Sequence, residues 1–439
     1  MNRKIIVVLA VIVGILSFSS FAVSQIERKL KDDLYSQIEL YSYVLATVQA
    51  DYVDKKDPKE LIYSSLKGMV GSLDPHSQFL TPEEYKELKT ETEGKFGGLG
   101  IEISIRDGLL TVISPIEGTP AWKAGVKAGD RIVKIENKLT RDMSLSDAVK
   151  KLRGKPGTDV TITILRESEF KIFDLTIKRA IINIPDVKNT QILEDHIGYI
   201  RLTEFREDSA IEFRKALDKL KKEGADSLIL DLRNNPGGLL KVAIKITEEF
   251  LPEGTLIVST KGRHPSQDIK TYSKNKDHVI TWPMVVLVNE GSASGSEILA
   301  GALKDNKRAI ILGTQTFGKG SVQSVIPLPD GSGLRLTTSK YFTPSGKSIH
   351  GKGITPDIIV KYVPPPKKEK NEKEKKVEEI FDNIEMREAK NPEKLKASKQ
   401  EKEEHDKLMR DNQILAAINV LKGVKVFSSF EKNGKSDIK

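Results

Sequence analysis

The stretch from Val285 to Gln323 constrains the fold of this chain more than any other. It begins with the apolar run V-V-L-V, followed by the turn N-E-G-S-A-S-G-S and an Ala/Leu-rich segment. An apolar run before a turn indicates a buried strand, and serines before an apolar periodic segment indicate a helix N-terminus. A second β-branched run, A-I-I-L-G, then leads to Lys319, which lies between two glycines. The stretch therefore predicts a strand, a helix and a second strand, with a serine and a lysine near their ends.

The same alternation of strands and helices starts upstream, at Ile197. The run I-G-Y-I-R-L precedes a predicted helix over residues 209–223, and the buried strand S-L-I-L-D-L then ends in the turn N-N-P-G-G. Another helix is predicted up to Phe250. Continuous apolar strands that alternate with helices are typical of α/β layers. We therefore predict an α/β core over residues 183–363.

Ser294 and Lys319 are the candidate nucleophile and base. The chain has no cysteine, no G-x-S-x-G elbow and no H-E-x-x-H motif, which argues against thiol, α/β-hydrolase and zincin chemistry. A lysine can accept a proton from serine where burial disfavours its charged form. The amide of Gly295 would lie at the helix start, where it can bind an oxyanion. If the strand is extended from Phe317, Gln323 shares a face with Lys319 and can orient its amine.

Two other interpretations of this stretch stay open on the pattern alone. The tetrapeptide from Ser294 to Glu297 is a capping box, S-x-x-E, which explains the serine structurally. The residues from Gly313 to Lys319 match the P-loop pattern G-x-x-x-x-G-K, but Gly320 replaces the Ser or Thr of that motif. The next residues also favour a strand rather than the phosphate-binding helix. Nucleotide binding is therefore disfavoured.

Residues 94–182 change to short strands, turns and one helix near Leu145. The segment from Gly98 to Ile101, which reads Gly98-Leu99-Gly100-Ile101, opens into an alternating strand. Free amides in a glycine loop can capture a carboxylate while the strand edge pairs with an incoming chain. With the later run A-G-V-K-A-G-D-R-I, this arrangement resembles a PDZ domain. The resemblance assigns Gly98, Leu99, Gly100 and Ile101 to the binding of a substrate C-terminus.

The N-terminal part combines a basic start, M-N-R-K, with a nearly uncharged run from Ile5 to Val23. Such a segment is either a cleaved export signal or a membrane anchor, so we assign residues 1–24 to this role. Residues 25–93 are predicted to be helical. Within them the motif L-D-P-H-S places His76 in a turn, where bonding to the backbone is favoured over catalysis.

The C-terminal part shows a sharp change in composition. Residues 364–411 carry many Lys and Glu and almost no aromatics, which favours a charged linker over a solvated helix. Residues 412–439 contain a short amphipathic helix, Q-I-L-A-A-I-N-V-L, which would dock on the core or on a second subunit. The net charge of +9 is spread along the chain, and no basic patch with interleaved aromatics predicts nucleic-acid binding. We predict no metal and no cofactor.

Taken in order, six motifs resemble the carboxyl-terminal processing proteases, also called tail-specific proteases. They are L-D-P-H-S, the PDZ loop, D-L-R-N-N-P-G-G, V-N-E-G-S-A-S-G-S-E-I, G-T-Q-T-F-G-K-G-S-V-Q and Y-F-T-P-S-G-K-S-I-H-G-K-G-I-T-P-D. The resemblance implies an α/β multidomain serine endopeptidase with a crotonase-like protease core, an inserted PDZ domain and a helical N-terminal region. It implies catalytic roles for Ser294, Lys319 and Gln323. It places the oxyanion amides at Gly295, where the family more often has alanine, and at Gly237 or Gly238, with Gly237 preferred.

The resemblance also implies what this protein acts on and where. Its substrates would be proteins with nonpolar C-termini, cleaved at or near those ends. The N-terminal segment, whether cleaved or retained, implies that the enzyme is exported to the cell envelope, either periplasmic or on the extracytoplasmic face of the inner membrane. An envelope adaptor partner, membrane attachment and a homo-oligomer are left open. The alternative function is a non-catalytic PDZ adaptor that binds C-terminal tails.

Overall fold

The computed structural model describes residues 33–365 and 402–434, apart from Gly94, Glu117, Ile184 and Asp277. The predicted signal or anchor segment and most of the predicted charged linker lie outside these residues. The chain divides into two compact units, one with residues 1–81 and 326–336 and one with residues 82–325 and 337–439. Across the described ranges, no helix is long and apolar enough to cross a membrane.

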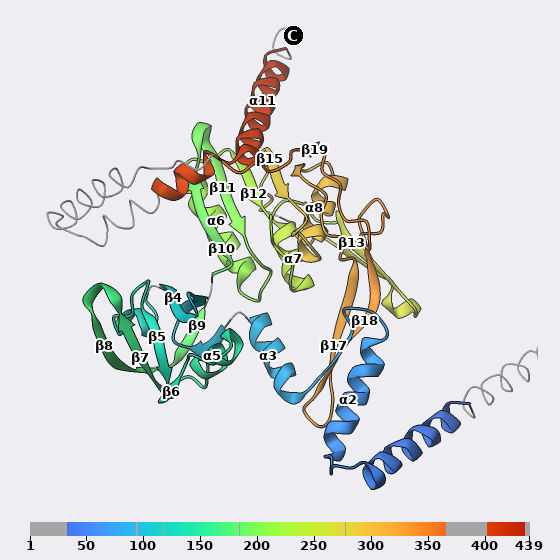
Figure 1. The fold of residues 1–439 in the computed structure, drawn as a ribbon. Coiled ribbons are helices and arrows are strands. Elements are labelled where there is room, and N and C mark those ends of the chain that lie inside the picture. Colours follow the sequence, from blue (N-terminus) through green and yellow to red (C-terminus); the bar gives the residue numbers. More distant parts are fainter. Residues whose placement is uncertain are drawn as a thin grey trace, which may run out of the picture. The chain divides into compact units, whose positions relative to one another are not determined.

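The first unit is built on helices and one small pairing of strands (Figure 1). Residues 33–51 are helical, and α2 (Pro58–Gly71) starts at Asp57, whose side chain accepts the N–H of Lys59. Strand β1 (Gln78–Leu80) pairs antiparallel with the first residues of β18 (Gly333–Phe342). Between α2 and β1, the N–H of His76 donates to Oδ1 of Asp74 at 2.7 Å. His76 therefore lies in a turn, as the interpretation favoured from the sequence predicts.

Six strands form the central sheet of the second unit, in the spatial order β10-β11-β12-β15-β16-β19. All run parallel except β10, which pairs antiparallel with β11. Every residue of β12 and β15 is buried, which explains the apolar runs L-I-L in β12 and M-V-V-L-V in β15. The bounds are β10 (Val187–Ile192), β11 (Ile197–Leu202), β12 (Ser227–Asp231), β15 (Met284–Val288), β16 (Ile310–Gly313) and β19 (Ile358–Ile359).

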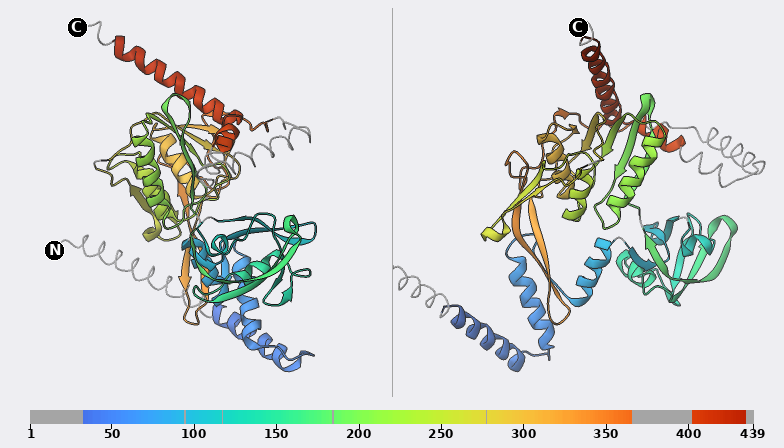
Figure 2. Two further views of the ribbon diagram at one scale, coloured as in Figure 1. Left: turned by 90° about the vertical axis from the view of Figure 1, so that its left-hand side faces the viewer. Right: turned by 180° about the vertical axis from the view of Figure 1, so that it is seen from behind.

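Helices cover both faces of this sheet (Figures 1 and 2). Three helices, α6 (Ser209–Lys222), α7 (Leu240–Glu248) and α8 (Gly295–Asp305), pack on the face that carries Ile200, Leu230 and Val286. The alternate strand residues, such as Tyr199, face helix α11 (Asn412–Gly434). The predicted α/β layer fold is therefore confirmed. The C-terminal helix is longer than its apolar motif, and it docks on the core of its own chain.

A second sheet of this unit contains β13 (Leu256–Gly262) and β14 (Ile269–Tyr272), which pair with each other. Strand β13 also pairs with the C-terminal half of β18. Strand β17 (Ser321–Pro327) pairs with β18. Because β17 follows Lys319 closely, this pairing fixes the segment that carries the predicted base.

The predicted PDZ domain forms a six-stranded sheet with its own hydrophobic core. Strands β2 (Lys95–Gly98) and β9 (Ala180–Asn183) pair and bring its two ends together, and helix α3 (Pro82–Glu93) precedes it with Pro82 as its first residue. Strand β7 (Asp159–Arg166) alternates between buried and less buried residues, as a half-covered sheet requires. The remaining elements are β3 (Ile101–Arg106), β4 (Leu109–Pro115), α4 (Pro120–Lys123), β5 (Arg131–Ile135), β6 (Lys138–Leu139), α5 (Leu145–Leu152) and β8 (Lys171–Lys178).

Candidate active site

The predicted catalytic residues gather at the carboxyl edge of the parallel core strands. The segments that follow β12, β15 and β16 all start at this edge, because the three strands are neighbours that run in one direction. Hydrogen bonds join the segments: Ser292 Oγ donates to the carbonyl of Leu232 at 2.8 Å, and the N–H of Thr314 donates to the carbonyl of Val288 at 3.1 Å. This edge is where open α/β sheets bind their ligands.

Ser294 has a backbone conformation that a non-glycine residue rarely adopts. It precedes α8 with φ of 51° and ψ of −110°, and its side chain is half-buried. Such strain concentrates at functional sites, where the surrounding structure holds it. The first helical residue, Gly295, is buried, and its N–H donates to no other group among the described residues. The geometry therefore leaves an amide donor beside the serine, at the positive end of the helix.

The turn after β12 packs directly against Ser294. A Cβ atom placed on Gly237, whose φ is 98°, would lie 2.7 Å from the amide nitrogen of Gly295, so only glycine fits here. The N–H of Gly237 donates to Oδ1 of Asn235 at 2.9 Å. The next amide, that of Gly238, makes no hydrogen bond to another described residue. Both glycines lie in the predicted oxyanion turn, and in this conformation the Gly238 amide is the unengaged one.

Lys319 is held by glycines that pack against the segment Ile349 to Gly353. Gly318 has φ of 91°, and a Cβ on Gly320 would lie 2.1 Å from the amide nitrogen of His350. Lys319 itself is half-buried. The following strand begins only at Ser321. The premise of an extended chain from Phe317 is therefore wrong, because Gly318 turns the backbone, and the P-loop alternative fails because a strand follows the lysine.

Gln323 lies in β17, two residues after the start of the strand. Its Nε2 donates to Oγ of Ser321 at 2.7 Å. Its amide nitrogen is thus engaged with Ser321, and the expected role of Gln323 in orienting Lys319 stays a prediction.

Glu297 connects the serine and the lysine segments, and the sequence interpretation treated it only as part of a capping box. Its Oε2 accepts the N–H of Ser294 at 2.9 Å and the N–H of Lys319 at 2.9 Å. The amide nitrogens of Ser294 and Lys319 are therefore at most 5.8 Å apart, which is the sum of these two distances of 2.9 Å. Its Oε1 accepts the hydroxyl of Thr316 at 2.5 Å and the N–H of Gly318 at 2.7 Å. The S-x-x-E pattern signals the contact between Glu297 and Ser294. Its spacing alone cannot reveal the contacts of Glu297 with the segment from Thr316 to Lys319.

The surroundings of Glu297 favour its ionised form through hydrogen bonds and oppose it through burial. The side chain is fully buried, and this burial raises its pKa, while the hydroxyl of Thr316 and the three amides act in the opposite direction. Three of the four partners are backbone N–H groups, which can only donate, whereas the Thr316 hydroxyl can donate or accept. The amides therefore favour the carboxylate, while burial holds the pKa of Glu297 above its usual range.

The predicted tail-binding loop lies at the edge of the PDZ sheet. Strand β3 is an edge strand of that sheet, so no other strand of the sheet pairs with its outer edge. The loop is fixed from behind: the N–H of Ala121 donates to the carbonyl of Leu99 at 2.9 Å, and Thr119 Oγ1 donates to the carbonyl of Gly100 at 3.1 Å. Gly100 has φ of 76° and no room for a side chain beside Thr119. A fixed loop next to an edge strand fits β-strand addition.

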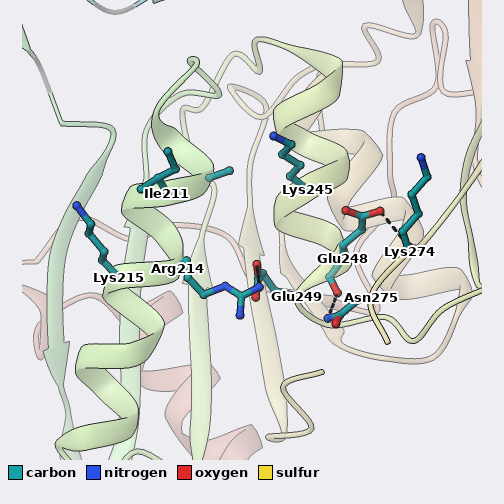
Figure 3. Close-up of a pocket in the computed structure, with 9 residues that line it drawn as sticks. Ile211, Arg214, Lys215, Lys245, Glu248, Glu249, Lys274 and Asn275 are labelled. Atoms are coloured by element: carbon teal, nitrogen blue, oxygen red, sulfur yellow. Dashed lines mark hydrogen bonds and ion pairs between the residues drawn. The ribbon is translucent and has the colours of Figure 1, made fainter. Parts of the chain in front are cut away.

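The described residues contain no cluster of His, Cys, Asp or Glu that could hold a metal ion. A cavity of about 570 Å³ lies between α6 and α7, and the predicted catalytic residues do not line it (Figure 3). Figure 3 shows Arg214 beside Glu249, and Nη2 of Arg214 lies 2.6 Å from Oε1 of that carboxylate. This cavity is separate from the serine and lysine segments.

Comparisons with known proteins match both the core and the smaller domain. Residues 196–360 match the family model described as peptidase family S41, and residues 111–166 match a PDZ domain. The chain is 44% identical over 372 residues to the carboxy-terminal-processing protease of Bartonella bacilliformis, covering 84% of this chain and 85% of that protein. It is 38% identical over 312 residues to the carboxy-terminal processing protease CtpA of Bacillus subtilis, covering 71% of this chain and 66% of that protein.

A solved structure, the photosystem II D1 C-terminal processing protease, is also similar. It is 31% identical, and the match covers 73% of this chain and 92% of that chain with a TM-score of 0.44.

Proposed function

This chain belongs to peptidase family S41 and is a serine protease of the carboxy-terminal-processing kind, and we propose that it cleaves proteins at or near nonpolar C-termini with Ser294 as nucleophile and Lys319 as base. One observation carries this proposal. A single buried oxygen, Oε2 of Glu297, accepts the backbone N–H groups of both residues. The two side chains therefore start from neighbouring backbone positions, although 25 residues separate them in the sequence.

The proposed reaction begins when Lys319 takes the hydroxyl proton of Ser294 as Oγ attacks the scissile carbonyl. The amides of Gly295 and of the Gly237–Gly238 turn would stabilise the oxyanion that develops. Lys319 then gives the proton to the leaving amine, and it activates a water that hydrolyses the acyl-enzyme. Gln323 would orient the lysine through its Oε1, which can accept from the amine while Nε2 keeps its hydrogen bond to Ser321.

Tail recognition is proposed to be the task of the PDZ domain. The substrate would add a strand to the edge of β3, and its terminal carboxylate would bind the amides of the loop Gly98–Ile101. Specificity for nonpolar tails fits the apolar residues that adjoin this loop, since Leu99 and Ile101 belong to or pack on the domain core. The domain would thus bring the end of a substrate to the protease core.

We further propose that the protein acts on the extracytoplasmic side of a membrane. The support is the basic start followed by the apolar run from Ile5 to Val23. Cell fractionation tests this directly: the full-length chain should appear in the envelope or the exported fraction, and recovery only from the cytoplasm would contradict it.

The function is tested by offering the purified chain from residue 25 onward a folded protein with an apolar C-terminal tail. We expect cleavage by the wild type, and we expect Ser294→Ala and Lys319→Ala to abolish it, because each removes one half of the proposed dyad. Both variants should still bind the tail, which serves as the control for folding. Tail binding without any cleavage by the wild type, even at raised pH, would favour the PDZ adaptor instead.

A further inference from the structure

Helix α11 makes polar contacts as well as apolar ones with the core. Its apolar side chains bury against the sheet face opposite to α6, α7 and α8, as Ile414 and Ile418 illustrate. At its N-terminus, Oδ1 of Asp411 accepts the N–H groups of Gln413 and Ile414 at 2.9 and 3.2 Å. Asp411 therefore caps the helix, and its second oxygen is available for another partner.

That partner is Arg233, the residue that precedes the turn Asn234–Gly238. Nη1 of Arg233 donates to Oδ2 of Asp411 at 2.8 Å and to Oε1 of Gln413 at 2.8 Å. Nε and Nη2 donate to the two oxygens of Asp231 at 2.9 and 2.7 Å. One guanidinium thus joins the end of a core strand to the start of the C-terminal helix.

This cluster is buried, so its partners are not replaced easily by water. Asp231 and Gln413 are almost fully buried, and Arg233 is 9% exposed. Burial alone would lower the pKa of Arg233, but its hydrogen bonds and charge interactions with Asp231 and Asp411 raise it, so the guanidinium stays charged. Removing the acceptors of Nη1 would leave a charged group incompletely paired in the interior.

The turn that Arg233 begins is tied to the serine segment. The carbonyl of Asn235 accepts the N–H of Ala293 at 3.0 Å and Oγ of Ser296 at 2.9 Å. The side chain of Asn234, a residue with φ of 57°, pairs with the amide of Asn289. A change in the position of Arg233 therefore acts on the residues that flank Ser294.

We propose that the C-terminal helix is a working part of the active site: Asp411 and Gln413 hold Arg233, and Arg233 holds the oxyanion turn against Ser294. This inference rests on the proposed Ser–Lys mechanism, and Arg233, Asp411 and Gln413 are positioning residues in it. The acylation step depends most on the turn, because its amides stabilise the oxyanion. Loss of the contact should then lower kcat and leave KM unchanged.

The test compares Asp411→Asn with Lys422→Ala in the full chain. Asp411→Asn keeps a cap acceptor and removes the charge that faces Arg233. Lys422→Ala breaks contacts further along the same helix, where Nζ lies 2.7 Å from Glu194 and 2.9 Å from Asp195. We expect kcat of Asp411→Asn to fall roughly tenfold with KM unchanged, as for other indirect couplings. Lys422→Ala should keep the wild-type kcat.

Two results would overturn the inference: an Asp411→Asn enzyme with the wild-type kcat, or a Lys422→Ala enzyme that loses as much as Asp411→Asn. If Asp411→Asn does not fold, the Gln413→Ala variant is measured instead, because it removes one acceptor of Arg233 and keeps the helix cap. A lower kcat for Gln413→Ala supports the inference, and an unchanged kcat overturns it. Covalent labelling of wild-type Ser294 in the same preparation separates the two claims. Absent labelling refutes the proposed mechanism, whereas normal labelling with unaffected variants refutes only the role of the helix.

Discussion

Glu297 shows how one buried side chain can define the geometry of two segments. Its carboxylate accepts hydrogen bonds from Ser294, Thr316, Gly318 and Lys319, and the partner is the donor in each of these contacts. A hydrophobic or amide side chain of the same size cannot satisfy this set. The residue therefore matters through its hydrogen-bonding pattern as well as its shape.

Replacing Glu297 with glutamine tests this role, because the amide keeps the shape and turns one oxygen into a donor. That donor would face either the pair of Ser294 and Lys319 or the pair of Thr316 and Gly318. We expect kcat to fall about a hundredfold, which corresponds to about 3 kcal/mol for mismatched charged hydrogen bonds. Steady-state kinetics provide the measurement, and Thr316→Ser, which keeps a hydroxyl donor, is the matched control. A Glu297→Gln enzyme with the wild-type kcat would show that the carboxylate only fills space.

Glu249 gives a prediction about the dependence of stability on pH. It is 8% exposed, its pKa is raised by burial, and its Oε2 has no hydrogen-bond partner among the described residues. A carboxyl group with a raised folded-state pKa contributes stability below its unfolded pKa, near 4.5, and loses this contribution as pH rises through the folded pKa. The wild type should therefore lose stability relative to Glu249→Gln as pH rises from below 4.5 towards neutrality.

Denaturant unfolding at several pH values measures this difference. Glu253→Gln, at an exposed position, is the control and should show a smaller pH-dependent difference from the wild type. A stability difference between Glu249→Gln and the wild type that stays constant with pH would contradict the expectation.

At the level of elements, the sequence predicts periodic structure better than the ends of segments. The buried strands β12 and β15 and the helices that follow them were predictable because each carries a continuous or periodic apolar pattern. The strand after Lys319 was placed too early, since the positive φ of Gly318 depends on packing against residues 349–353, far along the chain. The bridge made by Glu297 was hidden for the same reason, because S-x-x-E indicates a cap and carries no information about Thr316 or Gly318.

The docking of α11 leads to a prediction at this same level. Ile418 is 1% exposed and packs in the core cluster shared with β11, β12 and β15, whereas Phe427 is 65% exposed. Ile418→Ala should lower the free energy of unfolding by about 2–5 kcal/mol, because it leaves a cavity. Phe427→Ala should change it by less than about 0.5 kcal/mol. Equal effects of the two substitutions in chemical denaturation would argue against the observed docking of the helix.

At the level of the whole molecule, the protein combines a PDZ domain, proposed to bind the C-terminal end of a substrate, with a protease core, proposed to cleave that substrate. The edge strand and glycine loop of the PDZ domain and the serine and lysine segments of the core lie in different parts of the sequence. We propose that a substrate must satisfy both. The terminal carboxylate of the tail is then a requirement for efficient cleavage.

Amidating the C-terminus of a peptide substrate tests the carboxylate requirement. Loss of the negative charge removes charge-assisted hydrogen bonds to the loop amides, so binding to the Ser294→Ala chain should weaken by about tenfold or more. Isothermal titration with the free-acid and amidated peptides gives the two affinities. Equal affinities would refute the assignment of Gly98–Ile101 to the terminal carboxylate.

The central claim is that Ser294 is a nucleophile activated by Lys319, and covalent labelling with a serine-reactive fluorophosphonate probe tests it most directly. Mass spectrometry of the labelled wild type should find the adduct on Ser294. The Ser294→Ala chain should not be labelled, and Lys319→Ala should be labelled far more slowly while keeping its fold. Labelling at another residue, or a Lys319→Ala chain that reacts at the wild-type rate, would contradict the account.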